Sequence, residues 1–305
     1  MKFPLSKYIW FDGKLVPVNM AKVPVTTHAI HYGTSIFEGI RAYWNSRNLH
    51  VFRLKDHIKR FRNSGKFYNI KLNFSDRQIE NAVIDLCKKN KIKKSCYIRP
   101  FYFVGQYGIN FHVTQKAPTH AAIFAFPFGD LFNKNGITTT ISKWRKFSDM
   151  STPTQAKMGG NYLNSILATQ DAKQRGFDEA ILLDQSGNVS EAPGENIFLV
   201  KNNMLVTPSL SSSALDGITR RSIITLAKDM KLKIKTQKVS KKELKMADEI
   251  FLSGTAAEIT PVIKIDKKKI GEGKVGNITK LFMATYSDIV MNKSENYSHW
   301  LTVVY

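Results

Sequence analysis

The chain has 305 residues, 43% of them hydrophobic, and its 46 Lys and Arg against 24 Asp and Glu give a net charge of +22. This size suffices for one large or two medium domains with buried cores. No window approaches the ~20 apolar residues of a membrane helix, the N-terminal stretch has no continuous apolar leader segment, and Cys87 and Cys96 lack metal-ligand spacing. We therefore expect a cytoplasmic protein without a metal site or a membrane partner.

The excess of positive charge raises the question of a nucleic-acid partner. Lysines are spread along the chain, with small clusters such as residues 88–94, KKNKIKK. The sequence has no basic tail, no zinc-finger spacing and no aromatic RNA-binding motif. Each cluster stands in or beside a polar turn or a helix end, where solvated lysine is the simpler interpretation. We expect a dispersed surface charge and no nucleic-acid partner. A basic nucleic-acid-binding protein is the alternative from another functional class.

The pattern of the first half predicts a mixture of strands and helices. Two apolar runs flank Asp12-Gly13, a pair that favours the type I′ turn of a β-hairpin. Ser75 is a candidate N-cap, and Ile79, Val83 and Leu86 behind it form an apolar stripe at helical spacing. Strands are expected over residues 8–11, 14–18, 49–54, 95–105 and 119–128, and helices over 55–70 and 75–90.

The second half begins after a stretch without an apolar pattern, residues 130–136, which we interpret as a linker. Beyond it we expect strands over residues 137–144, 179–184, 196–200, 204–208 and 247–254, and helices over 162–176 and 217–230. The first of these helices is expected to bury Leu163, Ile166 and Leu167 and to end at Gly176. The interpretation is an α+β protein with a small N-terminal domain, 1–129, and a larger C-terminal domain, 137–305. A cleft between two domains is the natural ligand site.

Lys157 has unusual neighbours for a surface lysine, since Gly159, Gly160 and Tyr162 follow it closely. A lysine that is neutral at working pH can form a Schiff base with an aldehyde cofactor such as pyridoxal phosphate, and burial lowers its pKa toward that state. The glycines would let a flat ring lie close to the backbone, and the Tyr162 phenol can hydrogen-bond the ring oxygen. By itself, the stretch fits a surface lysine before a helix better than a cofactor lysine.

A pyridoxal-phosphate site makes further demands, for which the sequence offers candidates. The ring nitrogen needs an acidic partner, and Glu191 stands in a small-residue turn between two predicted strands. The phosphate needs an arginine and a helix N-terminus, which Arg60 and Thr219 supply in the predicted elements. The substrate carboxylate needs donors, and residues 253–255 stand at a strand end. Each of these residues also fits a plain structural role in a turn, a cap or a solvated helix face.

Six motifs together carry a resemblance to a known family. They are HAIHYGTSIFEGIR (28–41), YIRP (97–100), AKMGGNYLNS (156–165), VSEAPGENIF (189–198), SSALDGITR (212–220) and FLSGTAAEITP (251–261). Their content and order closely resemble the branched-chain amino-acid aminotransferases, which are fold-type IV pyridoxal-phosphate enzymes. The resemblance covers most of the chain. It implies the two-domain fold of those enzymes, with the cofactor site at the domain interface and the cofactor lysine in the C-terminal domain.

The resemblance also implies a role for each matching residue. Lys157 matches the Schiff-base lysine, Glu191 the partner of the ring nitrogen, and Tyr162 the partner of the ring oxygen. The phosphate contacts match Arg60, Ile218, Thr219 and Thr255. The backbone of Thr255 and Ala256 matches the receiver of the substrate α-carboxylate, and the side-chain pocket matches Tyr32, Phe37, Gly39, Tyr97 and Arg99. Tyr32 and Arg99 are further implied to receive the distal carboxylate of glutamate.

The activity implied by the resemblance is a branched-chain transamination. The amino group of L-leucine, L-isoleucine or L-valine passes to 2-oxoglutarate, which yields a branched 2-oxo acid and L-glutamate. A D-amino-acid aminotransferase and an aminodeoxychorismate lyase share Lys157 and Glu191 and are the alternatives within the superfamily. The motifs at 31–41 and 253–261 favour the branched-chain enzyme.

Two further features concern the pocket and the assembly. Some bacterial relatives carry a tryptophan and a tyrosine where this chain has Phe128 and Leu131, so the side-chain preference is less defined than the reaction type. The loop 105–113, GQYGINFHV, resembles one that reaches the pocket of a neighbouring subunit. The resemblance therefore implies a homo-oligomer, at least a dimer and up to a hexamer.

Overall fold

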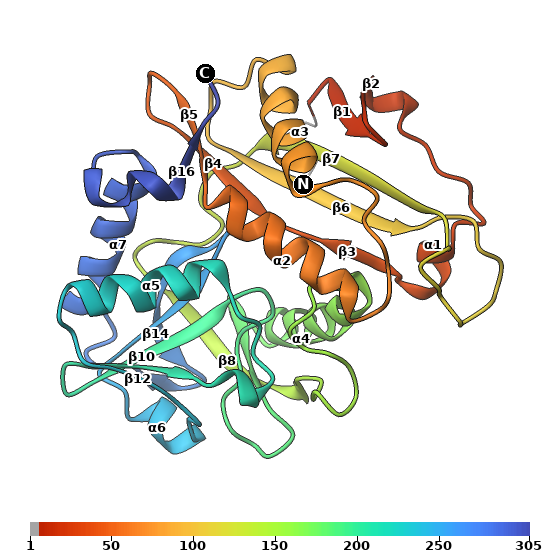
Figure 1. The fold of residues 1–305 in the computed structure, drawn as a ribbon. Coiled ribbons are helices and arrows are strands. Elements are labelled where there is room, and N and C mark those ends of the chain that lie inside the picture. The colour runs from red at the N-terminus through yellow and green to blue at the C-terminus, as the bar shows by residue number, and fades with distance from the viewer. Residues whose placement is uncertain (1–5) are drawn as a thin grey trace. The chain divides into compact units, whose positions relative to one another are not determined.

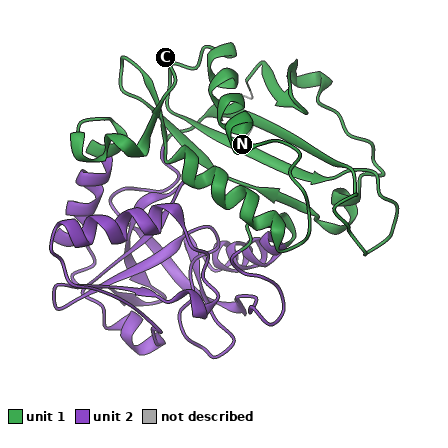
Figure 2. Cartoon of the chain, in the orientation of Figure 1, with its two compact units in different colours: residues 1–129, 156–160, 288–305 green, residues 130–155, 161–287 purple. Residues whose placement is uncertain are grey.

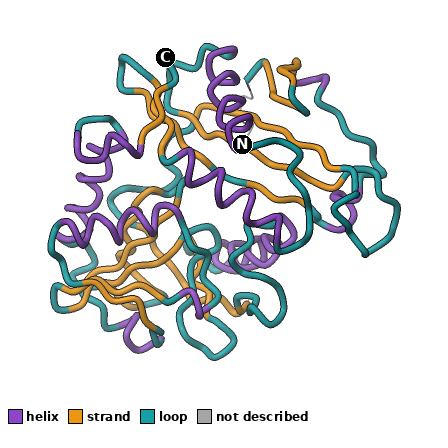
Figure 3. Tube along the Cα trace, in the orientation of Figure 1, coloured by secondary structure: helices purple, strands orange, loops and turns teal. Residues whose placement is uncertain are grey.

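A computed structural model of the chain describes residues 6–305. Residues 1–5, part of the stretch read for a leader segment, lie outside the described residues. The chain forms two compact units (Figure 2), unit 1 with residues 1–129, 156–160 and 288–305, and unit 2 with residues 130–155 and 161–287. Both units combine helices and strands (Figure 3), so the α+β prediction is confirmed. Within the described part, no helix has the length and apolar character needed to cross a bilayer.

Unit 1 is built on an eight-stranded antiparallel sheet with the order β16-β5-β4-β6-β7-β1-β2, and β3 pairs with β6 beside this path (Figure 1). The strands are β1 (Tyr8–Phe11), β2 (Lys14–Pro17), β3 (Ser35–Phe37), β4 (Ile40–Trp44), β5 (Leu49–Phe52), β6 (Cys96–Val104), β7 (Thr119–Pro127) and β16 (Leu301–Val303). The type I′ prediction for the first hairpin is confirmed, because Asp12 and Gly13 both have positive φ, 45° and 91°.

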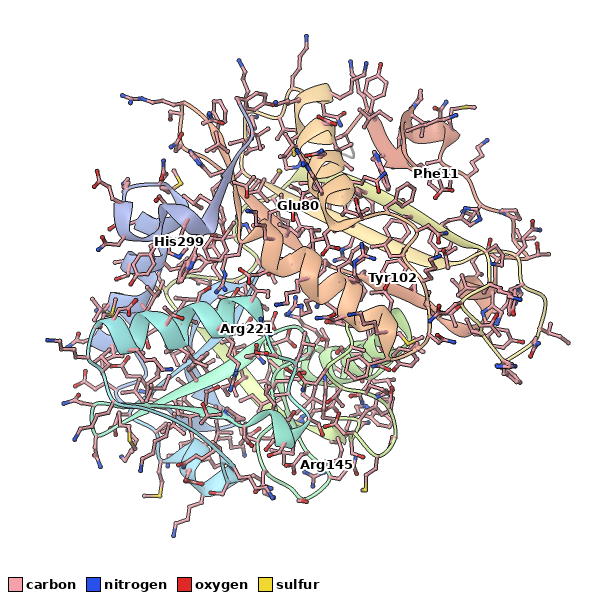
Figure 4. The ribbon with its side chains drawn as sticks, in the orientation of Figure 1. Phe11, Glu80, Tyr102, Arg145, Arg221 and His299 are labelled. Atoms are coloured by element: carbon pink, nitrogen blue, oxygen red, sulfur yellow. The ribbon has the colours of Figure 1, made fainter. Side chains whose placement is uncertain are left out.

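Helices α2 (Leu54–Lys66) and α3 (Asp76–Lys89) pack on the sheet of unit 1, and the short α1 (His28–Tyr32) lies near one end of β6. Ser75 caps α3 as predicted, since its hydroxyl accepts from the Gln78 N–H at 3.2 Å and the Gln78 side chain accepts from the Ser75 N–H at 2.8 Å. Phe61 of α2 meets the ring of Tyr102, labelled in Figure 4, edge-on at 4.7 Å. Burying a side chain of this size stabilises the unit by about 1.5–3 kcal/mol.

Unit 2 contains a second eight-stranded sheet, which mixes parallel and antiparallel pairs in the order β12-β11-β10-β13-β14-β8-β9, with β15 on β14. Its strands are β8 (Ile137–Arg145), β9 (Glu179–Leu183), β10 (Asn196–Lys201), β11 (Met204–Pro208), β12 (Ile234–Gln237), β13 (Glu249–Gly254), β14 (Glu258–Ile265) and β15 (Lys268–Lys269). Its helices are α4 (Tyr162–Gln174), α5 (Ile218–Asp229), α6 (Lys241–Lys245) and the greater part of α7 (Asn277–Val290). Short 3-10 helices occupy Val18–Met20, Gly159–Asn161, Leu210–Ser212 and Glu295–Trp300.

The orientation predicted for α4 is wrong. Leu163, Ile166 and Leu167 are 64%, 51% and 40% exposed, whereas Ala168 and Ala172 on the other side of the helix are fully buried. Helix α4 lies against β8 and β9, and small side chains on the contact face let the helix axis approach the sheet closely. The larger apolar residues are therefore left on the outer face of unit 2.

The contacts of Lys157 also differ from the expected domain assignment. Residues 156–160 group with unit 1 and not with the C-terminal part in which we placed the lysine. Met158 forms an isolated β-bridge with Ile36 of β3, and the Gly160 N–H donates to the Gly33 carbonyl at 3.2 Å. These long-range backbone contacts hold the lysine segment on the first sheet, which sequence order alone does not reveal.

Candidate active site

A buried charged cluster follows β3 in unit 1. Glu38 stands directly after the strand, and His57 and Arg60 lie one turn apart on α2. Arg60 donates from Nε to Glu38 Oε1 at 2.6 Å and from Nη2 to Oε2 at 2.8 Å, and His57 Nδ1 lies 2.8 Å from Oε2. Burial alone would raise the pKa of Glu38, but the charge of Arg60 and the hydrogen bonds from both partners hold that pKa far below its usual range. Glu38 is therefore ionised, and it fixes the plane of the Arg60 guanidinium.

Lys157 is held beside this cluster by backbone hydrogen bonds, and its amine is influenced by the charges of the cluster. Its N–H donates to Ser64 Oγ at 3.0 Å, and its carbonyl accepts from the Phe37 N–H at 3.1 Å. The amine lies 4.9 Å from the centre of the Phe37 ring. Burial and the positive charge of Arg60 lower the pKa of Lys157 to about 8, although the charge of Glu38 opposes them. Near pH 8 a large share of this amine is neutral, which is the state that a nucleophile or a base requires.

The glycines beside Lys157 have a packing reason of their own. A Cβ on Gly159 would stand 2.3 Å from Ser35 Oγ. Gly33, which has a φ of 66°, would place a Cβ 3.0 Å from the Gly160 backbone. Two segments far apart in the sequence thus approach within backbone contact distance, and this contact fixes the position of the lysine segment.

Arg99 is held between two aromatic rings, 4.6 Å from the centre of Phe37 and 5.2 Å from that of Tyr97. Its Nη2 donates to the Tyr97 hydroxyl at 3.0 Å, and its buried Nε has no partner among the described residues. A buried donor without a partner is costly, so the guanidinium is suited to an anionic ligand. Gly39 leaves room for the Tyr97 hydroxyl that Arg99 contacts, because a Cβ on residue 39 would stand 1.8 Å from that hydroxyl.

The remaining pocket residues of unit 1 fall into two groups. Phe128 lies 5.4 Å from Tyr97, ring centre to ring centre, and so joins the aromatic wall. Tyr32, at the end of α1, instead contacts His28 and Phe111, at 4.6 and 5.1 Å. The ring contacts of Tyr32 are thus with the 105–113 loop and α1 and not with Arg99, the residue with which the resemblance pairs it.

Unit 2 holds Glu191 in a dense network. Its Oε2 accepts from Asn196 Nδ2 at 3.1 Å and from the Leu215 N–H at 2.9 Å, and its Oε1 lies 2.6 Å from Lys146 Nζ. Burial alone would lower the pKa of Lys146, but the charge and hydrogen bond of Glu191 and the field of Tyr162 raise it. Lys146 is therefore charged beside the Glu191 carboxyl group.

The start of α5 lies close to the same network. Ile218 and Thr219 are buried in its first turn, which contains no acidic residue. A Cβ on the N-cap residue Gly217 would stand 2.0 Å from Asn196 Oδ1, so the helix start and the Glu191 network are in direct contact. An N-terminal helix turn without a carboxylate offers backbone N–H groups and a positive dipole end to an anion.

Thr255 and Ala256 lie in the turn between β13 and β14, where both are half-buried. Beside them, the hydroxyl of Ser253 is buried and has no partner among the described residues. Sequence reasoning found this turn but missed Glu38, His57 and Lys146. The signal for Glu38 was a single carboxylate between an aromatic residue and a glycine in an apolar stretch. Nothing in the sequence around Lys146 distinguished it from the other lysines.

Comparison with known proteins identifies the family of this chain. The family model for amino-transferase class IV matches residues 35–265. The chain therefore belongs to the class IV aminotransferases, and the resemblance found in the sequence is confirmed.

Several relatives are similar over the whole chain. The branched-chain-amino-acid aminotransferase of Salmonella typhimurium is 42% identical over 303 residues, 98% of each chain. A crystal structure of a branched-chain aminotransferase from Thermoproteus uzoniensis with norvaline has a TM-score of 0.95 at 41% identity and covers 98% of this chain and 100% of its own. A crystal structure of the T.th. branched-chain amino acid aminotransferase complexed with N-(5'-phosphopyridoxyl)-L-glutamate has a TM-score of 0.96 at 38% identity, with 100% of both chains covered.

Proposed function

We propose that this chain is a pyridoxal-phosphate-dependent branched-chain amino-acid transaminase. It transfers the amino group of L-leucine, L-isoleucine or L-valine to 2-oxoglutarate. The names of relatives that match it end to end support this activity. The observation that carries it in this chain is the lowered pKa of Lys157, about 8, in a site built from Arg60, Glu38 and Phe37.

The residues fit the cofactor at each point where chemistry is needed. Bound pyridoxal phosphate supplies an aldehyde that condenses with amines and a ring that withdraws electrons from the substrate α-carbon. Lys157 Nζ holds the cofactor at rest. Once released from the cofactor, the neutral Lys157 Nζ would act as the base for the substrate α-proton and would return that proton to the cofactor carbon that had carried the aldehyde. A pKa near 8 suits both steps, because the amine releases and takes up protons near neutral pH.

Glu191 would pair with the ring nitrogen of the cofactor, and Lys146 holds the Glu191 carboxylate in place, with Nζ 2.6 Å from Oε1. Tyr162 would donate a hydrogen bond to the ring oxygen. The anionic phosphate is received by Arg60, whose orientation the Glu38 carboxylate fixes, and by the residues at two backbone turns, Ile218, Thr219 and Thr255. The absence of carboxylates from the first turn of α5 supports this assignment.

The substrate is held by two sets of residues. The backbone of Thr255 and Ala256 receives the α-carboxylate, and Phe37, Gly39, Tyr97 and Phe128 form the apolar wall for the side chain. Arg99 receives the distal carboxylate of glutamate, with Tyr32 as the second partner. The aromatic rings on either side of Arg99 let leucine be accepted as well, because they keep the pocket apolar when no second carboxylate is present.

The protein is further proposed to act in the cytoplasm as a homo-oligomer, at least a dimer and up to a hexamer, with no nucleic-acid or membrane partner. Two exposed apolar surfaces support self-association. Ile109 and Phe111 on the 105–113 loop are 84% and 81% exposed, and the outer face of α4 exposes Leu163 and Ile166. Apolar surface of this kind favours burial against another subunit.

The activity is tested by the formation of L-glutamate from L-leucine and 2-oxoglutarate, with and without added pyridoxal phosphate. We expect turnover with L-leucine that depends on the cofactor and disappears in Lys157→Ala. D-leucine serves as the control substrate. A chain that accepts D-leucine in preference to L-leucine, or that transaminates neither, is not a branched-chain transaminase.

A further inference from the structure

Unit 1 contains a groove whose lining is strongly basic. It has a volume of about 890 Å³ and lies where the start of β1, the end of α3 and the loop after α3 meet. Six lysines line it, Lys7, Lys88, Lys89, Lys91, Lys93 and Lys94. The other lining residues are Ser6, Tyr8, Asn90, Ile92 and Pro127, so no carboxylate of the described chain contributes to the groove.

The walls of the groove are fixed by hydrogen bonds between distant segments. Asn90 joins α3 to β1, since its Oδ1 accepts from the Tyr8 N–H at 3.0 Å and its Nδ2 donates to the Tyr8 carbonyl at 3.1 Å. The Tyr305 hydroxyl donates to the Ile92 carbonyl at 3.0 Å, and Ser6 Oγ donates to the Ala125 carbonyl at 2.8 Å. The groove therefore exists before any ligand enters it.

The dipole of α3 accounts for only part of this charge. Lys88 and Lys89 stand in the last turn of α3, where positive charge favourably meets the helix dipole. The other four lysines lie outside the helix, and among the described residues none of the six forms an ion pair with a carboxylate. Like charges that line one groove repel one another wherever they come within about a Debye length, ~8 Å at physiological salt. A multivalent anion would relieve this repulsion.

We propose that the groove binds a small molecule that carries several phosphate groups. Lysine amines recognise phosphate as point charges, whereas planar carboxylates are better met by the arginine fork, and no arginine among residues 6–305 lines the groove. The volume lies within the range of small-molecule sites, roughly 300–1,000 Å³. The site is separate in its residues from those assigned to transamination.

Tyr8, the aromatic residue that lines the groove, narrows the class of ligand. Lys89 Nζ lies 4.7 Å from the centre of the Tyr8 ring, so a cation already occupies one face of that ring. Recognition therefore rests on the phosphates and not on stacking of a base. Inorganic tripolyphosphate is expected to bind as tightly as a nucleoside triphosphate, and both far more tightly than inorganic phosphate.

The test is isothermal titration of the full-length holoenzyme with sodium tripolyphosphate, ATP, inorganic phosphate and a single-stranded oligonucleotide at about 0.15 M salt. The groove variant is Lys91→Gln/Lys93→Gln/Lys94→Gln. The matched control is Lys267→Gln/Lys268→Gln/Lys269→Gln, which removes the same charge from three equally exposed lysines of unit 2. Since all six side chains are exposed, both variants are expected to fold, and thermal unfolding checks this.

We expect saturable binding of tripolyphosphate at one site per chain. The groove variant should lose about tenfold or more in affinity and the control less than about twofold. Equal losses in the two variants would mean that only the net charge attracts anions, and the proposal would fail. It would also fail if tripolyphosphate did not saturate, if ATP bound far more tightly than tripolyphosphate, or if the oligonucleotide were the preferred ligand.

Discussion

Replacing Arg99 by Met tests how one pocket accepts both an apolar and an acidic side chain. Arg99 Nε is buried without a partner among the described residues, and Nη2 donates only to the Tyr97 hydroxyl at 3.0 Å. The guanidinium therefore has donors for an incoming carboxylate. Methionine keeps apolar contact with Phe37, 4.6 Å from the present guanidinium, but removes the charge. This choice separates the loss of an ion contact from the loss of packing.

The expected cost follows from the strength of hydrogen bonds to charged groups, about 1.5–3 kcal/mol. Since about 1.4 kcal/mol corresponds to tenfold, the KM for glutamate and for 2-oxoglutarate should rise more than about tenfold in Arg99→Met. The KM for leucine should change by less than about threefold. Steady-state kinetics for each substrate measures this, and Arg47→Met, an exposed arginine of unit 1, is the control. Equal losses for leucine and glutamate would refute the reasoning and make Arg99 a structural residue.

Three further predictions concern the groups around the site. Because the pKa of Lys157 is lowered to about 8 in the folded chain, the unfolded chain binds more protons between that pH and about 10.4, and the cofactor-free protein should gain stability as pH rises through this window. Urea unfolding at pH 7 and 10 measures the gain, which should vanish in Lys157→Met. Lys146→Met leaves Glu191 buried without its cation and should cost about 3–5 kcal/mol of unfolding free energy, whereas Lys146→Met/Glu191→Gln should recover part of it; a single variant as stable as the parent contradicts the ion pair. Gly39→Ala puts a Cβ 1.8 Å from the Tyr97 hydroxyl, so Tyr97 must move and the KM for both glutamate and leucine should rise; unchanged values would show that the Tyr97 position is unimportant.

Local signals in the sequence predicted much of the fold. The Asp12-Gly13 turn and the Ser75 cap depend on interactions within a few residues, and both were confirmed. The face of α4 was predicted wrongly, because periodicity marks an apolar stripe but does not say which surface packs against the sheet. Ala168 and Ala172 fit closely on β8 and β9, and the larger residues were left outside.

The candidate site shows the same division between local and long-range information. Lys157, Glu191, Arg60 and Arg99 stood out through motifs. The residues that set the charge and orientation of these side chains did not stand out, because they are distant from them in the chain. Glu38 meets Arg60 22 positions away, and Lys146 reaches Glu191 only when β8 and the Glu191 turn are brought together by the sheet of unit 2. Contacts of this kind can be identified only in the folded structure.

The central claim is that Lys157 is the lysine that binds pyridoxal phosphate, and borohydride reduction followed by peptide mapping tests it most directly. Reduction fixes the cofactor to the amine that holds it. Lys146, which is buried and which the charge of Glu191 keeps protonated, serves as the internal comparison. We predict one pyridoxyl group per chain, on the peptide that contains Lys157, and none on that peptide in Lys157→Ala. A pyridoxyl group on Lys146 or on any other lysine would contradict the account.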